Sequence, residues 1–150
     1  MSENTSSVSE IMGRKVISVT GGEDVGEIKA VVLDRGANRI ERFQVGGRKR
    51  SPEMIDWEQV ESIGSDAVMI TAAEDVHESR KDEPDELYVR GDIEIIGAAV
   101  LDTAGFERGS VTDLHFDADS GAVLAAMTDD GRVAVEHLRS LGTYALVIDA

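Results

Sequence analysis

The chain has 150 residues, 41% hydrophobic and 30% charged, which indicates a folded globular protein. It contains no cysteine, which excludes a disulfide framework and fits a reducing cytoplasm. The formal net charge of −15 argues against a general nucleic-acid binder, because phosphate contacts need clustered Lys and Arg. Residues 1–10 lack the features of a secretory signal, and no apolar run approaches the roughly 20 residues that span a bilayer. We therefore expect a cytoplasmic protein without membrane insertion.

The polar residues 1–8 predict a flexible N-terminus. After them, short segments rich in Val and Ile alternate with Gly, Asn and Asp clusters, which is typical of hairpin-linked β-strands. Ile28, Val31 and Leu33 break strict alternation once, as a β-bulge does. Trp57, Val60 and Ile63 are spaced by three, which predicts one helical turn with a buried side.

One loop carries an insertion that stands out by its charge. Between Gly47 and Met54 lies the basic cluster Arg48, Lys49 and Arg50. A solvated loop is the simpler interpretation of such a cluster. The functional interpretation is a docking site for an acidic partner, for an RNA phosphate or for the acidic second half of the chain.

Residues 72–86 are polar and charged and predict a linker. The sequence before this linker is repeated after it. Residues 9–71 and 87–150 are therefore predicted to be two copies of one module. The correspondence has offsets of 84, 83 and then 78 residues, as in Ile11 and Ile95, Gly26 and Gly109, Asp34 and Asp117, Ser62 and Ser140, and Gly64 and Gly142.

About five strands in some 60 residues favour a small barrel, so the predicted fold class is all-β, with two small β-barrels in tandem and one short helical turn in each. Three motifs occur in this order in both copies. They are an opening G-x-x-V, a longer stretch that begins with glycine and ends in Asp, and an apolar turn that ends in glycine. In the first copy these are residues 13–16, 26–34 and 60–64; in the second they are residues 97–100, 109–117 and 138–142.

In these motifs the chain resembles the PRC-barrel family, whose named members include the H subunit of the photosynthetic reaction centre and a ribosome-maturation factor. The resemblance implies a compact adaptor that docks on proteins or ribonucleoproteins and has no known chemistry of its own. It implies neither the membrane anchor of the first member nor the separate N-terminal barrel of the second.

Several residues resemble parts of known chemical sites, and the sequence favours a structural role for each. The glycine-rich residues 21–27 have Glu where a phosphate loop needs Lys, so they predict a hairpin turn. Residues 117–121 begin like a calcium loop but have Gly121 at the third ligand position. Trp57 is expected in the core or between the barrels. The histidines lack metal-ligand spacing and are expected in structural roles: His77, His115 and His137. No catalytic, cofactor or metal site is predicted.

We therefore expect a non-catalytic protein-interaction adaptor that acts on a protein partner or forms a homo-oligomer. The alternative is an accessory factor in RNA or ribosome maturation that docks through Arg48, Lys49 and Arg50. Small barrels of about 60 residues are marginally stable alone, which predicts that the copies support each other. The apolar residues Ile93, Ile95 and Ile96, in the segment that precedes the second barrel, exceed what one small core needs.

Overall fold

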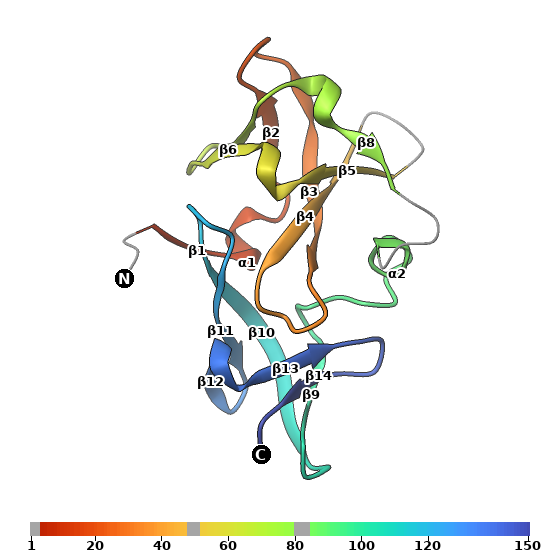
Figure 1. The fold of residues 1–150 in the computed structure, drawn as a ribbon, viewed down its shortest axis with the longest axis vertical. Coiled ribbons are helices and arrows are strands. Elements are labelled where there is room, and N and C mark those ends of the chain that lie inside the picture. The colour runs from red at the N-terminus through yellow and green to blue at the C-terminus, as the bar shows by residue number, and fades with distance from the viewer. Residues whose placement is uncertain (1–3, 48–51, 80–84) are drawn as a thin grey trace.

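The protein is described by a computed structural model that covers residues 4–47, 52–79 and 85–150. Its strands form two curled sheets, one above the other in Figure 1. The first sheet has the order β6-β7-β2-β3-β4-β5-β8, in which β7 and β2 are parallel and the other pairs are antiparallel. Its strands are β2 (Lys15–Ser18), β3 (Asp24–Leu33), β4 (Ile40–Gly46), β5 (Glu53–Asp56), β6 (Val60–Ile63), β7 (Ala67–Ile70) and β8 (His77–Glu78).

The second sheet repeats this arrangement in the order β12-β11-β10-β9-β14-β13, again with one parallel pair, β14 and β9. A further strand, β1 (Thr5–Ser7), pairs with β10. The other strands are β9 (Ala99–Asp102), β10 (Glu107–Asp117), β11 (Val123–Thr128), β12 (Gly131–Ala134), β13 (Leu138–Leu141) and β14 (Leu146–Ile148). The all-β fold with two small barrels is thus confirmed. We call the first sheet module 1 and the second module 2.

Several backbone hydrogen bonds outside the strands join corresponding residues in the two modules. The same bond occurs in both modules at the offsets of 84, 83 and 78 found in the sequence. Examples are Gly13 N–H to Ile28 C=O and Gly97 N–H to Val111 C=O, Val19 N–H to Ile70 C=O and Thr103 N–H to Ile148 C=O, and Gly64 N–H to Ala67 C=O and Gly142 N–H to Ala145 C=O. The predicted bulge is also present, as a register shift after Ile28 in β3 and after Val111 in β10.

The described part of the chain contains three short 3₁₀ turns: η1 (Trp57–Gln59), η2 (Ala73–Asp75) and η3 (Val135–His137). The predicted helical turn over residues 57–63 is therefore wrong beyond Gln59, because residues 60–63 form β6. A register shift between Val60 and Ser62, and an equivalent one between Leu138 and Ser140, explains the spacing of three. A bulge adds one residue to the alternation of a strand, so residues three apart lie on one face.

The N-terminus differs from the flexible segment predicted for residues 1–8. Thr5–Ser7 form β1, and Val8–Ile11 form the single-turn helix α1, whose Val8 and Ile11 are buried. The physical reason is that β9 covers only residues 107–110 of β10, which leaves the backbone of residues 115–117 to be paired by another strand.

The linker predicted over residues 72–86 contains regular structure at both ends. It includes η2 and β8, which pairs with β5, and the helix α2 (Asp85–Val89) begins within it. The segment that precedes β9, residues 85–98, therefore starts with a helix. We call this segment the leader of module 2, and residues 4–14, which precede β2, the leader of module 1.

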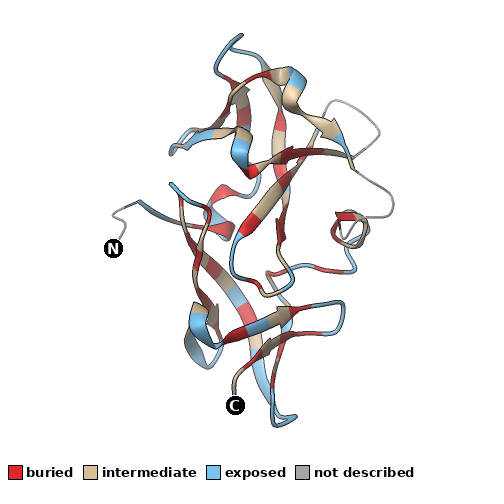
Figure 2. Ribbon diagram, viewed as in Figure 1, coloured by how far each residue is buried: buried red, intermediate tan, exposed pale blue. Residues whose placement is uncertain are grey.

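The two modules share one hydrophobic core, and Figure 2 shows buried stretches on both sheets where they face each other. Trp57 lies between Phe43 and Phe116, with ring centroids at 5.8 and 6.3 Å. The β3–β4 and β10–β11 turns also exchange two hydrogen bonds of 2.8 Å. These bonds run from Ile40 N–H to Gly121 C=O and from Val123 N–H to Asn38 C=O, flanking a bridge between Arg39 and Ala122.

Candidate functional site

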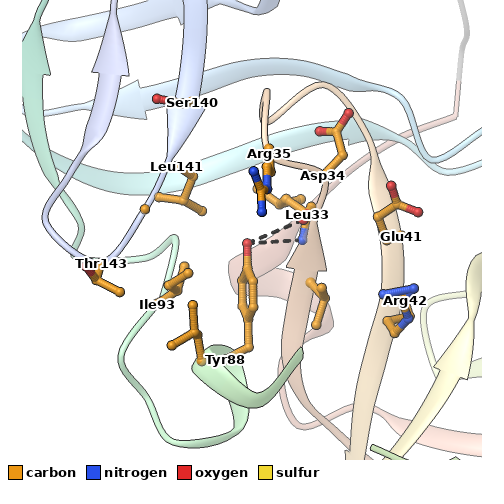
Figure 3. Close-up of a pocket in the computed structure, with 13 residues that line it drawn as sticks. Leu33, Asp34, Arg35, Glu41, Arg42, Tyr88, Ile93, Ser140, Leu141 and Thr143 are labelled. Carbon is orange, nitrogen blue, oxygen red and sulfur yellow. Dashed lines mark hydrogen bonds between the residues drawn. The ribbon is translucent and has the colours of Figure 1, made fainter. Parts of the chain in front are cut away.

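A groove of about 700 Å³ lies between module 1, α2 and module 2. The β3–β4 hairpin forms one wall, the turn between β13 and β14 forms the opposite wall, and α2 closes one end (Figure 3). Its floor is apolar and its rim is charged on the β3–β4 side. The lining residues are Val32, Leu33, Asp34, Arg35, Glu41, Arg42, Leu87, Tyr88, Ile93, Ser140, Leu141, Gly142 and Thr143.

Tyr88 stands in the centre of this groove and is 5% exposed. Figure 3 shows its ring between Leu33 on one side and Ile93 and Leu141 on the other. The Leu33 N–H donates to the Tyr88 hydroxyl at 3.4 Å, and the hydroxyl donates to the Leu33 carbonyl at 3.5 Å. Burial raises the pKa of Tyr88 to about 12, against the lowering effect of the bond with Leu33. The group is therefore an uncharged donor and acceptor at neutral pH.

An ion-pair network fixes α2 against module 1. Arg42 on β4 contacts Asp85 of α2 at 2.9 Å and Asp56 of β5 at 3.3 Å, and the Asp85 side chain is 2% exposed. His77 of β8 contacts the same Asp56 oxygen at 3.1 Å. Burial acts to raise the pKa of Asp56, but His77 and Arg42 outweigh it and the net direction is down. Arg42 thus neutralises a buried carboxylate and ties the start of module 2's leader to the sheet of module 1.

Asp34 and Arg35, at the end of β3, also have structural partners. The Asp34 carboxylate accepts the N–H groups of Asn38 and Arg39 at 2.7 and 3.3 Å, which closes the β3–β4 turn. The Arg35 carbonyl accepts the N–H of Leu141 at 3.1 Å, which joins the two walls of the groove. The Asp34 side chain and the Arg35 carbonyl therefore stabilise the shape of the groove.

The docking site predicted at Arg48, Lys49 and Arg50 lies outside the described residues. The connection that contains it, residues 47–52 between β4 and β5, is longer than the equivalent connection of residues 129–130 between β11 and β12. That difference agrees with an insertion in the first copy.

The residues considered for metal or phosphate chemistry occupy structural positions. The Asp117 carboxylate accepts the N–H groups of Asp119 and Ser120, so residues 117–121 form a turn. His77 pairs with Asp56 and His137 lies 3.5 Å from Asp149, while His115 lies within β10. Within the described ranges, no group of three or more His, Asp or Glu is arranged to hold a metal ion.

Sequence reasoning did not identify the groove. Its walls come from segments more than 100 residues apart, and local patterns do not report such contacts. One signal was present, because the apolar excess around Ile93 marks the segment that packs against β3. No pattern in the sequence pointed to Tyr88 as a residue of the groove.

A model of the PRC-barrel domain matches residues 3–77, and the chain therefore belongs to the PRC-barrel family. The match covers module 1. No curated protein gives a significant match to the chain. Among the described residues, no helix has the length and apolar character needed to cross a membrane.

Proposed function

We propose that the protein is a non-catalytic interaction adaptor whose partner protein docks in the groove between the two modules. The observation that carries this proposal is the groove itself, because it joins an apolar floor to a charged rim in a volume of about 700 Å³. Fully desolvated apolar centres with polar rims are the usual anatomy of protein interfaces.

The chemistry of the groove supports binding rather than catalysis. The Asp34 carboxylate closes the β3–β4 turn, the Arg42 guanidinium forms ion pairs, and the Tyr88 hydroxyl bonds to the backbone of Leu33. The family membership agrees, since PRC-barrel domains are small β-barrel interaction modules.

The competing hypothesis, docking on RNA through residues 48–50, can be separated in the same experiment. Full-length protein with Thr143→Trp, which places a large ring at the rim of the groove, is used as bait in native extract alongside the wild type. The matched control is Thr20→Trp, because Thr20 is also exposed but lies outside the lining of the groove. RNase is added to half of each sample.

We expect the wild type and Thr20→Trp to retain the same partner, with and without RNase, and Thr143→Trp to lose it. Partners retained equally by all three proteins would contradict docking in the groove. Partners released by RNase, and by charge reversal at Arg48, Lys49 and Arg50, would support the RNA hypothesis instead.

A further inference from the structure

The central strands β3 and β10 each have an edge that their neighbouring strand covers only in part. β2 pairs with residues 24–27 of β3, and β9 pairs with residues 107–110 of β10. Beyond these points the backbone on that edge continues, at residues 32–35 in module 1 and at residues 115–118 in module 2. Backbone groups at such a position need partners other than the neighbouring strand.

In module 2 the protein fills this edge with its own strand. β1 pairs antiparallel with β10, with Ser6 opposite Phe116, and the Ala118 N–H donates to the Asn4 carbonyl at 2.8 Å. In an antiparallel ladder every second residue points its N–H and C=O to the same neighbour. Phe116, two residues before Ala118, therefore presents both groups to Ser6.

In module 1 the equivalent of Phe116 is Leu33, at the offset of 83, and no described strand pairs with this edge. The Leu33 N–H and C=O bond instead to a single hydroxyl, that of Tyr88, at 3.4 and 3.5 Å. Both distances lie beyond the usual 2.7–3.2 Å of such bonds. Residues 32–35, the counterparts of the segment that β1 covers, all line the groove.

The two edges differ because the segments that precede the modules have different structures. The counterparts of residues 4–7 are residues 88–91, at the offset of 84. They do not extend into a strand, because Tyr88 lies in α2, and the Arg90 and Gly91 N–H groups close its end on Glu86 and Tyr88 carbonyls. The Tyr88 ring thus reaches the backbone that a strand would otherwise pair.

We propose that an extended segment of a partner protein adds to β3 along residues 32–35, antiparallel to it, and displaces the Tyr88 hydroxyl from Leu33. This inference rests on the proposed function and names the mode of binding in that groove. Strand β1, which pairs with β10, indicates what kind of segment would bind to β3. Residues 4–7, which include β1, are small and polar and form an extended segment. Main-chain bonds provide affinity in this mode of recognition, and side-chain fit provides specificity.

The space available also favours small side chains. The incoming strand must pass between Leu33 and Tyr88, both buried, and the Leu141 N–H already holds the Arg35 carbonyl. In module 2 the β1 residues opposite Phe116 and His115 are both serines, Ser6 and Ser7, and Ser7 is 4% exposed. A partner segment rich in Ser, Thr, Gly or Ala meets these limits.

The test uses the full chain, labelled with ¹⁵N, and a synthetic peptide with the sequence of residues 1–8. We expect saturable amide shift changes centred on residues 32–35 and on Tyr88. The same peptide with Ser6→Pro lacks the N–H that would bond to the Leu33 carbonyl, so it should cause no such changes. Equal binding of both peptides, changes confined to residues 115–117 through exchange with β1, or no changes would each overturn the proposal.

Two variants test the role of the hydroxyl. Tyr88→Phe removes the competing bonds and keeps the ring, so it should bind the peptide roughly two- to tenfold more tightly, as expected for one net hydrogen bond. Tyr144→Phe is the matched control, because Tyr144 is 75% exposed, and it should bind as the wild type does. Unchanged affinity in Tyr88→Phe would contradict displacement. If Thr143→Trp loses its cellular partner while the peptide leaves residues 32–35 unaffected, the proposed function stands and strand addition fails.

Discussion

At the scale of single residues, Gly121 of module 2 packs closely against Trp57 of module 1. Gly121 has a φ of +79°, and a Cβ added there would lie 2.8 Å from the Cε2 atom of Trp57. Its carbonyl also accepts the Ile40 N–H from the other module. Only glycine allows this turn to close against the ring, since other residues rarely adopt this conformation and would overlap with the indole.

Gly121→Ala is therefore expected to destabilise the protein by about 2–4 kcal/mol, through left-handed strain together with overpacking. Gly105→Ala is the control. Gly105 has a φ of +91° but nothing within 4 Å of an added Cβ, so it should cost only about 1 kcal/mol. Urea unfolding of both variants measures the difference. Equal losses would show that the turn does not pack against Trp57 as described.

At the scale of elements, α1 docks on module 2 through one carboxylate. Asp113 of β10 accepts the Ser9 hydroxyl at 2.6 Å and the Ser9 N–H at 3.0 Å. Burial acts to raise the pKa of Asp113, but the bonds from Ser9 and Leu114 outweigh it and the net direction is down from 3.8. The leader of module 1 is thus held on module 2 by a charged acceptor.

This docking predicts a specific pH dependence. Because the folded pKa of Asp113 lies below its unfolded value, its contribution to stability is present above pH 3.8 and is lost as the pH falls through the folded value. Asp113→Asn should lower the free energy of unfolding by about 1 kcal/mol at pH 6, and by less at pH 3. Urea midpoints at the two pH values measure this. Asp66→Asn, in the exposed turn after β6, is the control and should show little change at either pH.

At the scale of the whole molecule, we expect the modules to fold as one unit. The core is continuous from module 1 to module 2, and each module receives the leader of the other, because α1 and β1 contact β10 while α2 contacts β3. Barrels of about 60 residues are marginally stable alone, so loss of this shared apolar surface removes a large part of the total stability.

Residues 1–75 and 87–150, expressed separately, should therefore melt at least about 10 °C below the intact chain or self-associate, since losing about two kcal/mol suffices for this shift. Mixing them in equal amounts should restore part of the stability, because β1 in the first fragment can then pair with β10. Differential scanning calorimetry and sedimentation measure both effects. Two monomeric fragments as stable as the parent would show that the barrels are independent.

Sequence reasoning predicted the fold well where the signal was local or repeated. The hairpins, the bulge after Ile28 and the equivalence of the two copies follow from apolar spacing and glycine positions. The extent of the helical turn at residues 57–63 was wrong, because a bulge in β6 produces the same spacing. The strand β1 was missed, since Thr5–Ser7 carry no apolar alternation and pair only because β10 offers an unpaired edge more than 100 residues away.

The reciprocal bonds between the β3–β4 and β10–β11 turns have a consequence for stoichiometry. Ile40 corresponds to Val123 and Asn38 to Gly121, so each module gives the other the same bond that it receives, as in a two-fold symmetric dimer. In a symmetric dimer of two identical chains, both subunits would have a binding groove or neither would. In this chain the two leaders differ, since one contains β1 and the other contains α2. The molecule is therefore expected to be monovalent and to bind one partner segment per chain.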